Sequence, residues 1–197
     1  MQAIILAAGM GKRLGALTEH NTKCMITVNG ITLIDRMLSQ LSLLDLSRVI
    51  IVVGYEREKL ITFIGNKYPS LNITYIENPI YDKTNNIYSL ALTKEYLVEE
   101  DTLLLESDLI FDHSLLELIL TNSYPNLALV SKYEAWMDGT MVTIDSDNNI
   151  ETFVPKRFFR YDDIDSYYKT VNIYKFSKVF LVSFYVPFVE AYSYAIG

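Results

Sequence analysis

Two glycines and two basic residues stand together on one short segment near the start of the chain. Gly9 and Gly11 carry no side chain, so an anion can approach their backbone N–H groups closely. Lys12 and Arg13 follow directly and add two positive charges. The combination suits the negative charges of a polyphosphate. A strand-to-helix turn with exposed basic residues would have the same letters, so this segment by itself leaves both interpretations open.

The spacing of the segment excludes two common phosphate loops. A Walker loop needs a glycine where this chain has Leu6, and Ser or Thr where Arg13 follows Lys12. A dinucleotide fingerprint needs a third glycine where Leu14 stands, and an acidic residue where the second apolar run ends in Val53-Gly54. The segment therefore indicates a phosphate loop of another kind.

A carboxylate follows a run of leucines later in the chain. Asp108 comes after Leu103-Leu104-Leu105, with Glu106 two residues before it. If the run is a strand of a parallel sheet, Asp108 lies at the edge where ligands bind. Carboxylate oxygens there suit Mg²⁺, the usual ion at triphosphates. The alternative, a cap for the helix that starts near Ser114, is weakened because Asp112 is better placed for that role.

The elements that must position these residues alternate along the chain. Short apolar runs rich in branched residues predict buried strands at Ala3–Ala8, Val49–Val53, Ile73–Ile76, Leu103–Leu105 and Leu127–Val130. Amphipathic patterns between them predict helices at Ile34–Leu44, Glu56–Ile64, Ile87–Leu97 and Ser114–Leu120. This alternation favours a three-layer α/β domain with a mixed, mainly parallel sheet.

The pattern changes from about residue 139. Met141–Ile144 and Ile150–Val154 flank a polar turn and predict a hairpin, which a long strand at Tyr167–Phe176 follows. These strands indicate a small β insertion beside the main sheet. Because no repeat or linker divides the chain, we expect residues 1–197 to form a single domain.

Composition narrows the function classes. The net charge of −7 leaves no broad positive field for a nucleic acid or an anionic membrane. The longest apolar stretch, Val179–Val189, is shorter than the ~20 residues of a membrane span. The apolar run at the start precedes its basic residues, the reverse of a signal peptide, so we expect a cytoplasmic protein. One cysteine and two isolated histidines exclude an internal disulfide and a standard zinc site.

A longer set of motifs resembles the opening of the nucleotidyltransferases that activate sugar phosphates and phosphocholine. It comprises Leu6 to Leu14, Leu17-Thr18, Thr22 to Met25, Val28-Asn29-Gly30, Leu33-Ile34, Val52 to Tyr55 and Glu106-Ser107-Asp108. The resemblance implies a Rossmann-like α/β/α fold of the nucleotide-diphospho-sugar-transferase type. It also implies that the nucleoside triphosphate is bound by Leu6, Ala8, Gly9, Gly11, Lys12, Arg13 and Lys23.

The same resemblance implies roles in the reaction. Lys23 would reach the α-phosphate, Arg13 would hold the outer phosphates, and Asp108 would bind Mg²⁺, which makes these three the catalytic residues. Thr22 and Ala16 replace prolines that are usual in the family, and neither change removes a charge. An anionic acceptor oxygen is already a competent nucleophile, so the absence of a His or Cys constellation agrees with this chemistry.

One segment favours cytidine nucleotides. Asn78 to Leu90 replaces the glycine-rich signature of sugar nucleotidyltransferases and is similar to bacterial choline-phosphate and aminoalkylphosphonate cytidylyltransferases. The resemblance implies CTP as the nucleotide and places Asn86 and Ser89 near the nucleotide and acceptor. An asparagine can bond a base edge, but Asn86 could equally cap the helix that begins at Ile87.

Aromatic and acidic residues near the middle of the chain suit a cationic acceptor. Trp136 lies between Glu134 and Asp138, and an ammonium group gains from an aromatic face and a carboxylate. A surface loop whose Trp covers the sheet edge is the alternative. The choline-phosphate enzymes resemble this chain in placing a Trp here. Asn172, a polar residue in an apolar strand, could face the acceptor or bond neighbouring backbone.

These features predict Mg²⁺-dependent cytidylyl transfer from CTP to phosphocholine or 2-aminoethylphosphonate, with release of pyrophosphate. A sugar-1-phosphate nucleotidyltransferase that uses UTP or dTTP and a nucleotide-binding regulatory module are the alternatives. The family's second metal carboxylate has no match here, and the chain stops at Gly197 where the family usually continues. We therefore expect a missing C-terminal portion, with fusion to a pyridoxal-phosphate aminotransferase as one form of the native protein.

Overall fold

The computed structural model describes the backbone of residues 1–196 and the side chains of residues 1–192. The chain divides into two compact units. The first contains Met1–Leu127 and the chain from Tyr174 onward, and the second contains Ala128–Ile173.

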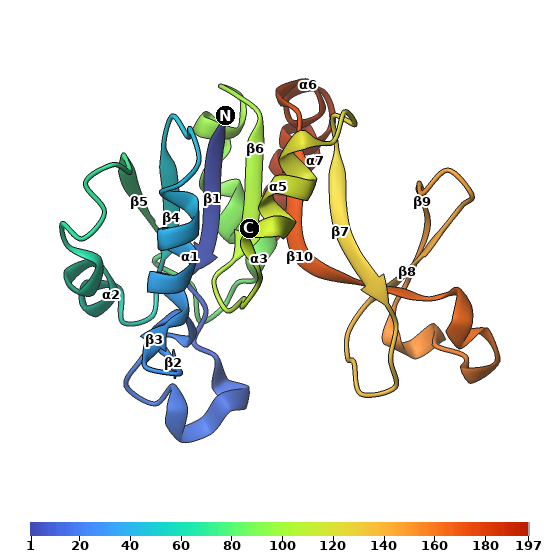
Figure 1. Cartoon of the computed structure of the whole chain (residues 1–197), viewed down its shortest axis with the longest axis horizontal. Coiled ribbons are helices and arrows are strands. Elements are labelled where there is room, and N and C mark those ends of the chain that lie inside the picture. Colours follow the sequence, from blue (N-terminus) through green and yellow to red (C-terminus); the bar gives the residue numbers. More distant parts are fainter. Residues whose placement is uncertain (197) are drawn as a thin grey trace. The chain divides into compact units, whose positions relative to one another are not determined.

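A parallel sheet forms the centre of the first unit. Its strands are β1 (Gln2–Ala7), β4 (Val49–Val53), β5 (Ile73–Glu77) and β6 (Thr102–Glu106), in the order β5-β4-β1-β6 (Figure 1). All three pairings are parallel, as the apolar runs predict. In the β1–β6 register Leu6 lies beside Glu106, so the loops that leave these strands emerge next to each other.

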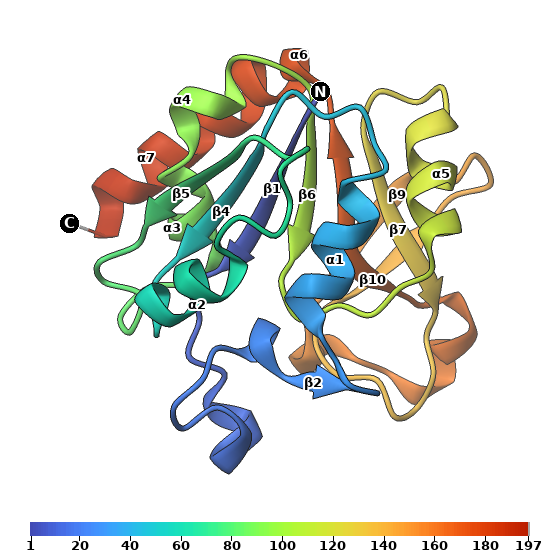
Figure 2. The same ribbon diagram turned by 60° about the vertical axis from the view of Figure 1, so that its left-hand side comes forward.

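Helices cover both faces of this sheet. Figure 2 shows α1, α2 and α5 on one face and α3, α4 and α7 on the other. Their bounds are α1 Leu33–Leu41, α2 Arg57–Ile64, α3 Asn86–Ala91, α4 Lys94–Leu97, α5 His113–Thr121 and α7 Val186–Ile196. The N-cap of α5 is Asp112, whose carboxylate accepts from the Ser114 N–H at 3.0 Å, so Asp108 is not used as the cap.

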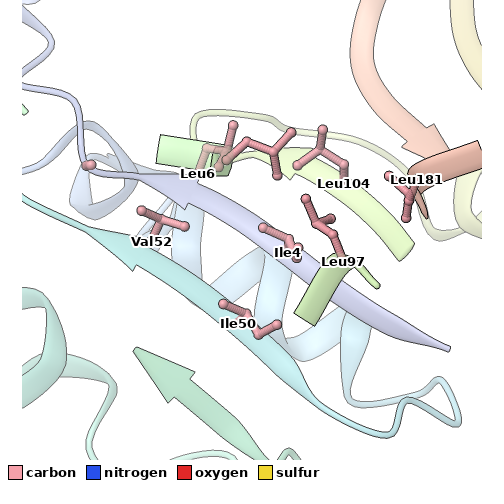
Figure 3. Packing of buried hydrophobic residues seen from close by; sticks show 9 residues of the cluster. Ile4, Leu6, Ile50, Val52, Leu97, Leu104 and Leu181 are labelled. Atoms are coloured by element: carbon pink, nitrogen blue, oxygen red, sulfur yellow. The ribbon is translucent and has the colours of Figure 1, made fainter. Parts of the chain in front are cut away.

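A cluster of apolar side chains forms the core beneath α3, α4 and the C-terminal helix. Side chains of alternate strand residues point to this side and pack with residues of the helices (Figure 3). The labelled members are Ile4, Leu6, Ile50, Val52, Leu97, Leu104 and Leu181. The intervening residues of β1 are buried as well, because the other face is also covered. Because β1 is buried on both faces, packing fixes the position of the strand end from which the glycine loop leaves.

The chain between β1 and α1 is mostly irregular. It contains 3-10 turns at Lys12–Leu17 and Lys23–Met25 and a small hairpin of β2 (Thr27–Val28) and β3 (Ile31–Thr32). No side chain of the Lys12–Leu17 turn is buried. This loop therefore depends on hydrogen bonds rather than on a core of its own.

The second unit is antiparallel. Strand β8 (Met141–Ile144) pairs with β9 (Ile150–Val154) and with β10 (Tyr168–Phe176), and β7 (Leu127–Lys132) also pairs with β10. Strands β7 and β10 each begin in one unit and end in the other. The predicted hairpin and the predicted long strand are confirmed. Because these strands add antiparallel pairings to the parallel ones, the prediction of a mixed, mainly parallel sheet is also confirmed. The unit begins at Ala128, earlier than the change of pattern near residue 139 suggested.

Two helical features differ from the prediction. The helix expected at Ile87–Leu97 is divided into α3 and α4, because Thr93 leaves the helical conformation and its hydroxyl donates to the Leu90 carbonyl at 2.7 Å. A further helical segment follows β10, with α6 (Lys178–Phe180), a π-turn at Leu181–Tyr185 and α7, where no helix was predicted. Among the described residues, no helix has the length and apolar character needed to cross a membrane.

Candidate active site

A pocket of about 310 Å³ opens at the carboxyl ends of β1 and β6, entirely within the first unit. It lies where the sequence places the two polar segments, because β1 and β6 are direct neighbours. The pocket is lined by Leu6, Gly9, Gly11, Lys12, Arg13, Lys23, Asn86, Glu106, Ser107 and Asp108. The structure thus brings together most of the predicted nucleotide-binding residues and the predicted metal ligand.

Gly11 lets the loop and Lys23 come into contact. Its φ of 64° is in the left-handed region, and a Cβ there would lie 2.5 Å from Cγ of Lys23. A side chain would therefore displace Lys23 as well as strain the backbone. Lys12 and Arg13 follow with exposed side chains, and no ion pair within the described part of the chain uses either of them. Both charges are available to a ligand.

Lys23 and Asp108 form an ion pair across the pocket. The Lys23 Nζ lies 2.9 Å from Oδ2 of Asp108, and their side chains are 26% and 31% exposed. Lys23 opens a 3-10 turn, whereas Asp108 follows β6 by two residues. The fold therefore joins residues 85 positions apart in the sequence.

Cys24, next to Lys23, packs into the interior. It is fully buried, and burial raises the pKa of its thiol to about 11, so the thiol stays protonated at neutral pH. Its sulfur lies 3.0 Å from the Thr22 hydroxyl. Cys24 thus anchors the turn that presents Lys23, as expected of a packing residue.

The structure separates two roles that the sequence left open for Asn86. The N-cap of α3 is Asn85, whose side-chain oxygen accepts from the backbone N–H groups of Ile87 and Tyr88. Asn86 lines the pocket instead, and its amide donates to Oε1 of Glu106 at 3.0 Å. This bond orients the amide, so its carbonyl oxygen is the atom left to accept from a ligand.

Two predicted nucleotide-binding residues do not line the pocket. Ala8 is buried, and its backbone oxygen accepts from the Tyr55 N–H. Ser89 is buried, and its hydroxyl accepts from the Asn78 amide at 3.1 Å. Both residues lie close in the sequence to residues of the pocket and are buried, but they do not line it. Their contact with a nucleotide stays a prediction.

The three predicted acceptor-binding residues belong to the second unit. Trp136 is 76% exposed, and its Nε1 donates to Glu134 at 2.9 Å. Asp138 pairs with Lys156 at 2.8 Å. Asn172 has a φ of 60° and accepts from the Thr170 hydroxyl at 3.3 Å. Their role toward an acceptor stays a prediction.

Sequence reasoning assigned no role to Ser107, which also lines the pocket. The available signal was its position directly after the buried strand β6, between two carboxylates. The sequence pattern indicates that Glu106 lies near Asp108, but no local signal indicates its bond to Asn86.

The pocket residues fit a magnesium ion in its usual triphosphate setting. Glu106 and Asp108 supply carboxylate oxygens, the hard donors that Mg²⁺ prefers. No cluster of three metal-ligating His, Cys, Asp or Glu side chains occurs in the described part of the chain. One or two carboxylates suffice where phosphate oxygens and water complete the shell, so the donor set agrees with an ion that binds together with a triphosphate.

A family model for the MobA-like NTP transferase domain matches residues 3–143. The chain belongs to this family. The match includes the glycine loop, Lys23, Asn86 and Asp108, so the pocket lies wholly within the family domain. The suspected relationship and the fold class are both confirmed.

Individual relatives agree with this family. The chain is 30% identical over 191 residues to a CMP-5'-(3-aminopropyl)phosphonate synthase of Streptomyces rubellomurinus, covering 96% of this chain and 30% of that protein. It is 36% identical over 112 residues to a choline-phosphate cytidylyltransferase of Streptococcus pneumoniae, covering 54% and 47%. The chain therefore spans less than half the length of these two relatives.

A solved structure is also similar. The inositol-1-phosphate CTP transferase from T. maritima superimposes with a TM-score of 0.70 at 25% identity, covering 92% of this chain and 72% of that one. Its name and those of the two relatives all refer to cytidine nucleotides, while the acceptors differ.

Proposed function

We propose that this chain transfers a cytidylyl group from CTP to a small amino-alcohol phosphate or phosphonate and releases pyrophosphate. The observation that carries the proposal is the pocket itself. It places Gly11, Lys12 and Arg13 beside Lys23 and Asp108 at one sheet edge. Such a set can bind a triphosphate and stabilise charge at its α-phosphorus.

The basic residues bind different phosphates of the triphosphate according to their position in the pocket. Lys12 and Arg13, on the exposed loop, bind the β- and γ-phosphates that leave as pyrophosphate. Lys23, held against Gly11, turns from Asp108 to an α-phosphate oxygen when the triphosphate is present. Its positive charge then lies where negative charge builds up as the acceptor oxygen attacks.

Asp108 and Glu106 would hold Mg²⁺ in this pocket, and the ion would neutralise phosphate charge and orient the triphosphate. Apart from these two carboxylates, no described residue that lines the pocket could act as a general base, and the reaction needs none. The acceptor oxygen of a phosphate or phosphonate is already anionic at neutral pH. The principal barrier is the approach of two anions, which the positive charges of the pocket lower.

Asn86 can bond the edge of a pyrimidine base. One N–H of its amide donates to Glu106, which leaves its carbonyl oxygen to accept and its second N–H to donate. The carbonyl oxygen can accept from the exocyclic amino group of cytosine and the N–H can donate to the carbonyl of uracil, so this side chain is compatible with CTP but does not by itself select it. Three similar proteins whose names refer to cytidine nucleotides support CTP, whereas a similar protein of Haloferax volcanii is named for UTP and glucose-1-phosphate.

Trp136, Asp138 and Asn172 are proposed to select the acceptor. An exposed indole beside a carboxylate suits an ammonium group. The cation–π interaction with the aromatic face would contribute about 1–2 kcal/mol to binding of the ammonium group when water is excluded. The aminopropylphosphonate and choline-phosphate relatives support an acceptor of this charge. A fused pyridoxal-phosphate aminotransferase remains a separate prediction, which the mass of the native protein tests.

A pyrophosphate-release assay tests the proposed function. Each of CTP, UTP, dTTP and ATP is paired with phosphocholine, 2-aminoethylphosphonate and glucose-1-phosphate. The proposal expects turnover with CTP and an amino-bearing acceptor. Turnover only with UTP or dTTP and glucose-1-phosphate would establish the sugar nucleotidyltransferase alternative. Tight CTP binding in calorimetry without turnover would favour a regulatory module.

A further inference from the structure

The loop that carries the phosphate-binding charges has little packing of its own. None of the residues of the Lys12–Leu17 turn is buried. Within the loop, the Thr18 hydroxyl lies 3.0 Å from the Gly11 carbonyl and 3.3 Å from the Gly15 carbonyl. These bonds close the turn on itself. They do not tie it to the body of the first unit.

Two side chains from another part of the sequence make that tie. The Tyr55 hydroxyl donates to the backbone carbonyl of Glu19, and Nζ of Lys59 donates to that of His20 at 2.6 Å. Tyr55 follows β4, and Lys59 lies in α2. Both therefore reach the loop from elements that the sheet and core hold in place.

Tyr55 is fixed where it meets the end of β1. Its backbone N–H donates to the carbonyl of Ala8 at 3.1 Å. The preceding Gly54 packs so closely that a Cβ would lie 2.8 Å from both the Ala8 oxygen and Cβ of Tyr81. Tyr55 thus contacts the chain just before the loop through its backbone and the returning loop through its hydroxyl.

The hydroxyl, rather than packing of the ring, makes the link to the loop. A hollow of about 330 Å³ lies between them and is lined by Met10, Lys12, Gly15, Thr18, Glu19 and Tyr55. Because the ring leaves this space unfilled, removing the hydroxyl alone should release the loop without creating a new cavity.

We propose that Tyr55 and Lys59 are positioning residues that hold the loop of residues 9–20 in the shape that binds the triphosphate. The proposal rests on the proposed function for the identity of the nucleotide. A loop ordered in advance loses less conformational entropy when the ligand binds. Since the two side chains bind main-chain carbonyls, they act on the loop backbone and touch neither the phosphates nor the reacting atoms.

Kinetics of Tyr55→Phe and Lys59→Met test the proposal. Each loss of a hydrogen bond should raise the KM for CTP by roughly 3- to 10-fold and leave kcat within about 2-fold. We expect a change in KM but not in kcat because the loop holds the outer phosphates equally in the ground state and in the transition state. The controls are Tyr124→Phe, an exposed tyrosine away from the loop, and Lys67→Met, whose ammonium contacts Asp35.

Limited trypsin digestion gives a second measurement that requires no turnover. Cleavage after Lys12 and Arg13, followed by mass spectrometry of the new peptide ends, reports how often the loop opens. Both variants should be cut at these sites at least 3-fold faster than the wild type, with unchanged cleavage elsewhere. CTP should slow the cut in all proteins.

The outcomes separate this inference from the proposed function. Faster cleavage and weaker CTP binding in calorimetry would support the positioning role even if no acceptor turned over. Unchanged cleavage in both variants, or faster cleavage with an unchanged affinity for CTP, would overturn it. Because the side chain of Lys59 is exposed, Lys59→Met should fold. It therefore tests the positioning role even if Tyr55→Phe fails to fold.

Discussion

The two units of the chain hold their polar residues in different ways. In the first unit Asp108 and Lys23 follow or face buried strands, and strand register determines which residues meet. In the second unit Trp136 and Asp138 are exposed and contact Glu134 and Lys156 of the same unit. Residues fixed by strand register suit chemistry that every substrate needs, whereas exposed loop residues suit the choice of acceptor.

This difference predicts that substitutions in the first unit change turnover, whereas those in the second change acceptor preference. Three similar proteins named for cytidine nucleotides differ in their acceptors. A similar protein of Haloferax volcanii is named for UTP and glucose-1-phosphate, so the names alone do not separate the two kinds of specificity.

The largest effect is expected for Lys23→Ala. Loss of a charge that acts on the α-phosphate should lower kcat about 100-fold, the scale of one electrostatic stabiliser, with little change in CTP affinity. Steady-state kinetics and calorimetry measure the two quantities. Lys83→Ala, which removes an exposed charge that does not line the pocket, is the control. An unchanged kcat with a raised KM for CTP would show that Lys23 only binds the nucleotide.

Asp108→Asn should shift the Mg²⁺ dependence. The neutral amide binds the ion less well, so half-maximal activity should need about 10-fold more Mg²⁺, with slower turnover at saturation. EDTA should abolish activity of both proteins. Asp112→Asn removes a carboxylate four residues away that caps α5, and it should leave the Mg²⁺ dependence unchanged. Equal behaviour of the two variants would mean that Asp108 does not hold the metal.

Gly11→Ala should weaken triphosphate binding by about 10-fold. The new Cβ strains the left-handed backbone of the loop that carries Lys12 and Arg13, and this distortion weakens binding. It also displaces Lys23, whose Cγ lies 2.5 Å from the Cβ position, and this should lower kcat. Gly30→Ala is the matched control, since Gly30 also has a positive φ but nothing within 4 Å of its Cβ position. Calorimetry with CTP distinguishes them. Similar losses of affinity in both would indicate general destabilisation rather than distortion of the phosphate loop.

The smallest effect is expected for Trp136→Ala. Loss of an aromatic face should raise the KM for an amino-bearing acceptor by about 5- to 10-fold and leave the KM for CTP unchanged. Phe153→Ala removes another exposed aromatic side chain of the second unit and should change neither value. A raised KM for CTP in Trp136→Ala would break the division between the two units.

Local patterns determined most of the fold. Three strands have the predicted bounds: Val49–Val53, Met141–Ile144 and Ile150–Val154. A strand buried on both faces leaves a strong local signal in the sequence, and so do two apolar runs that flank a polar turn. The helical segment after β10 was missed. Its helical residues are interrupted by the π-turn at Leu181–Tyr185, which breaks the regular spacing that identifies an amphipathic helix.

For the site, the sequence by itself determined which residue types line the pocket: a glycine loop with two charges, a lysine and a carboxylate after a strand. Only the tertiary structure decided their partners. The pairing of Lys23 with Asp108 and of Asn86 with Glu106 depends on strand order and register, which bring together residues 85 and 20 positions apart. The support of the loop by Tyr55 and Lys59 has the same origin. Sequence spacing reports contacts within a helix or strand, whereas contacts between elements are fixed by how their buried faces pack.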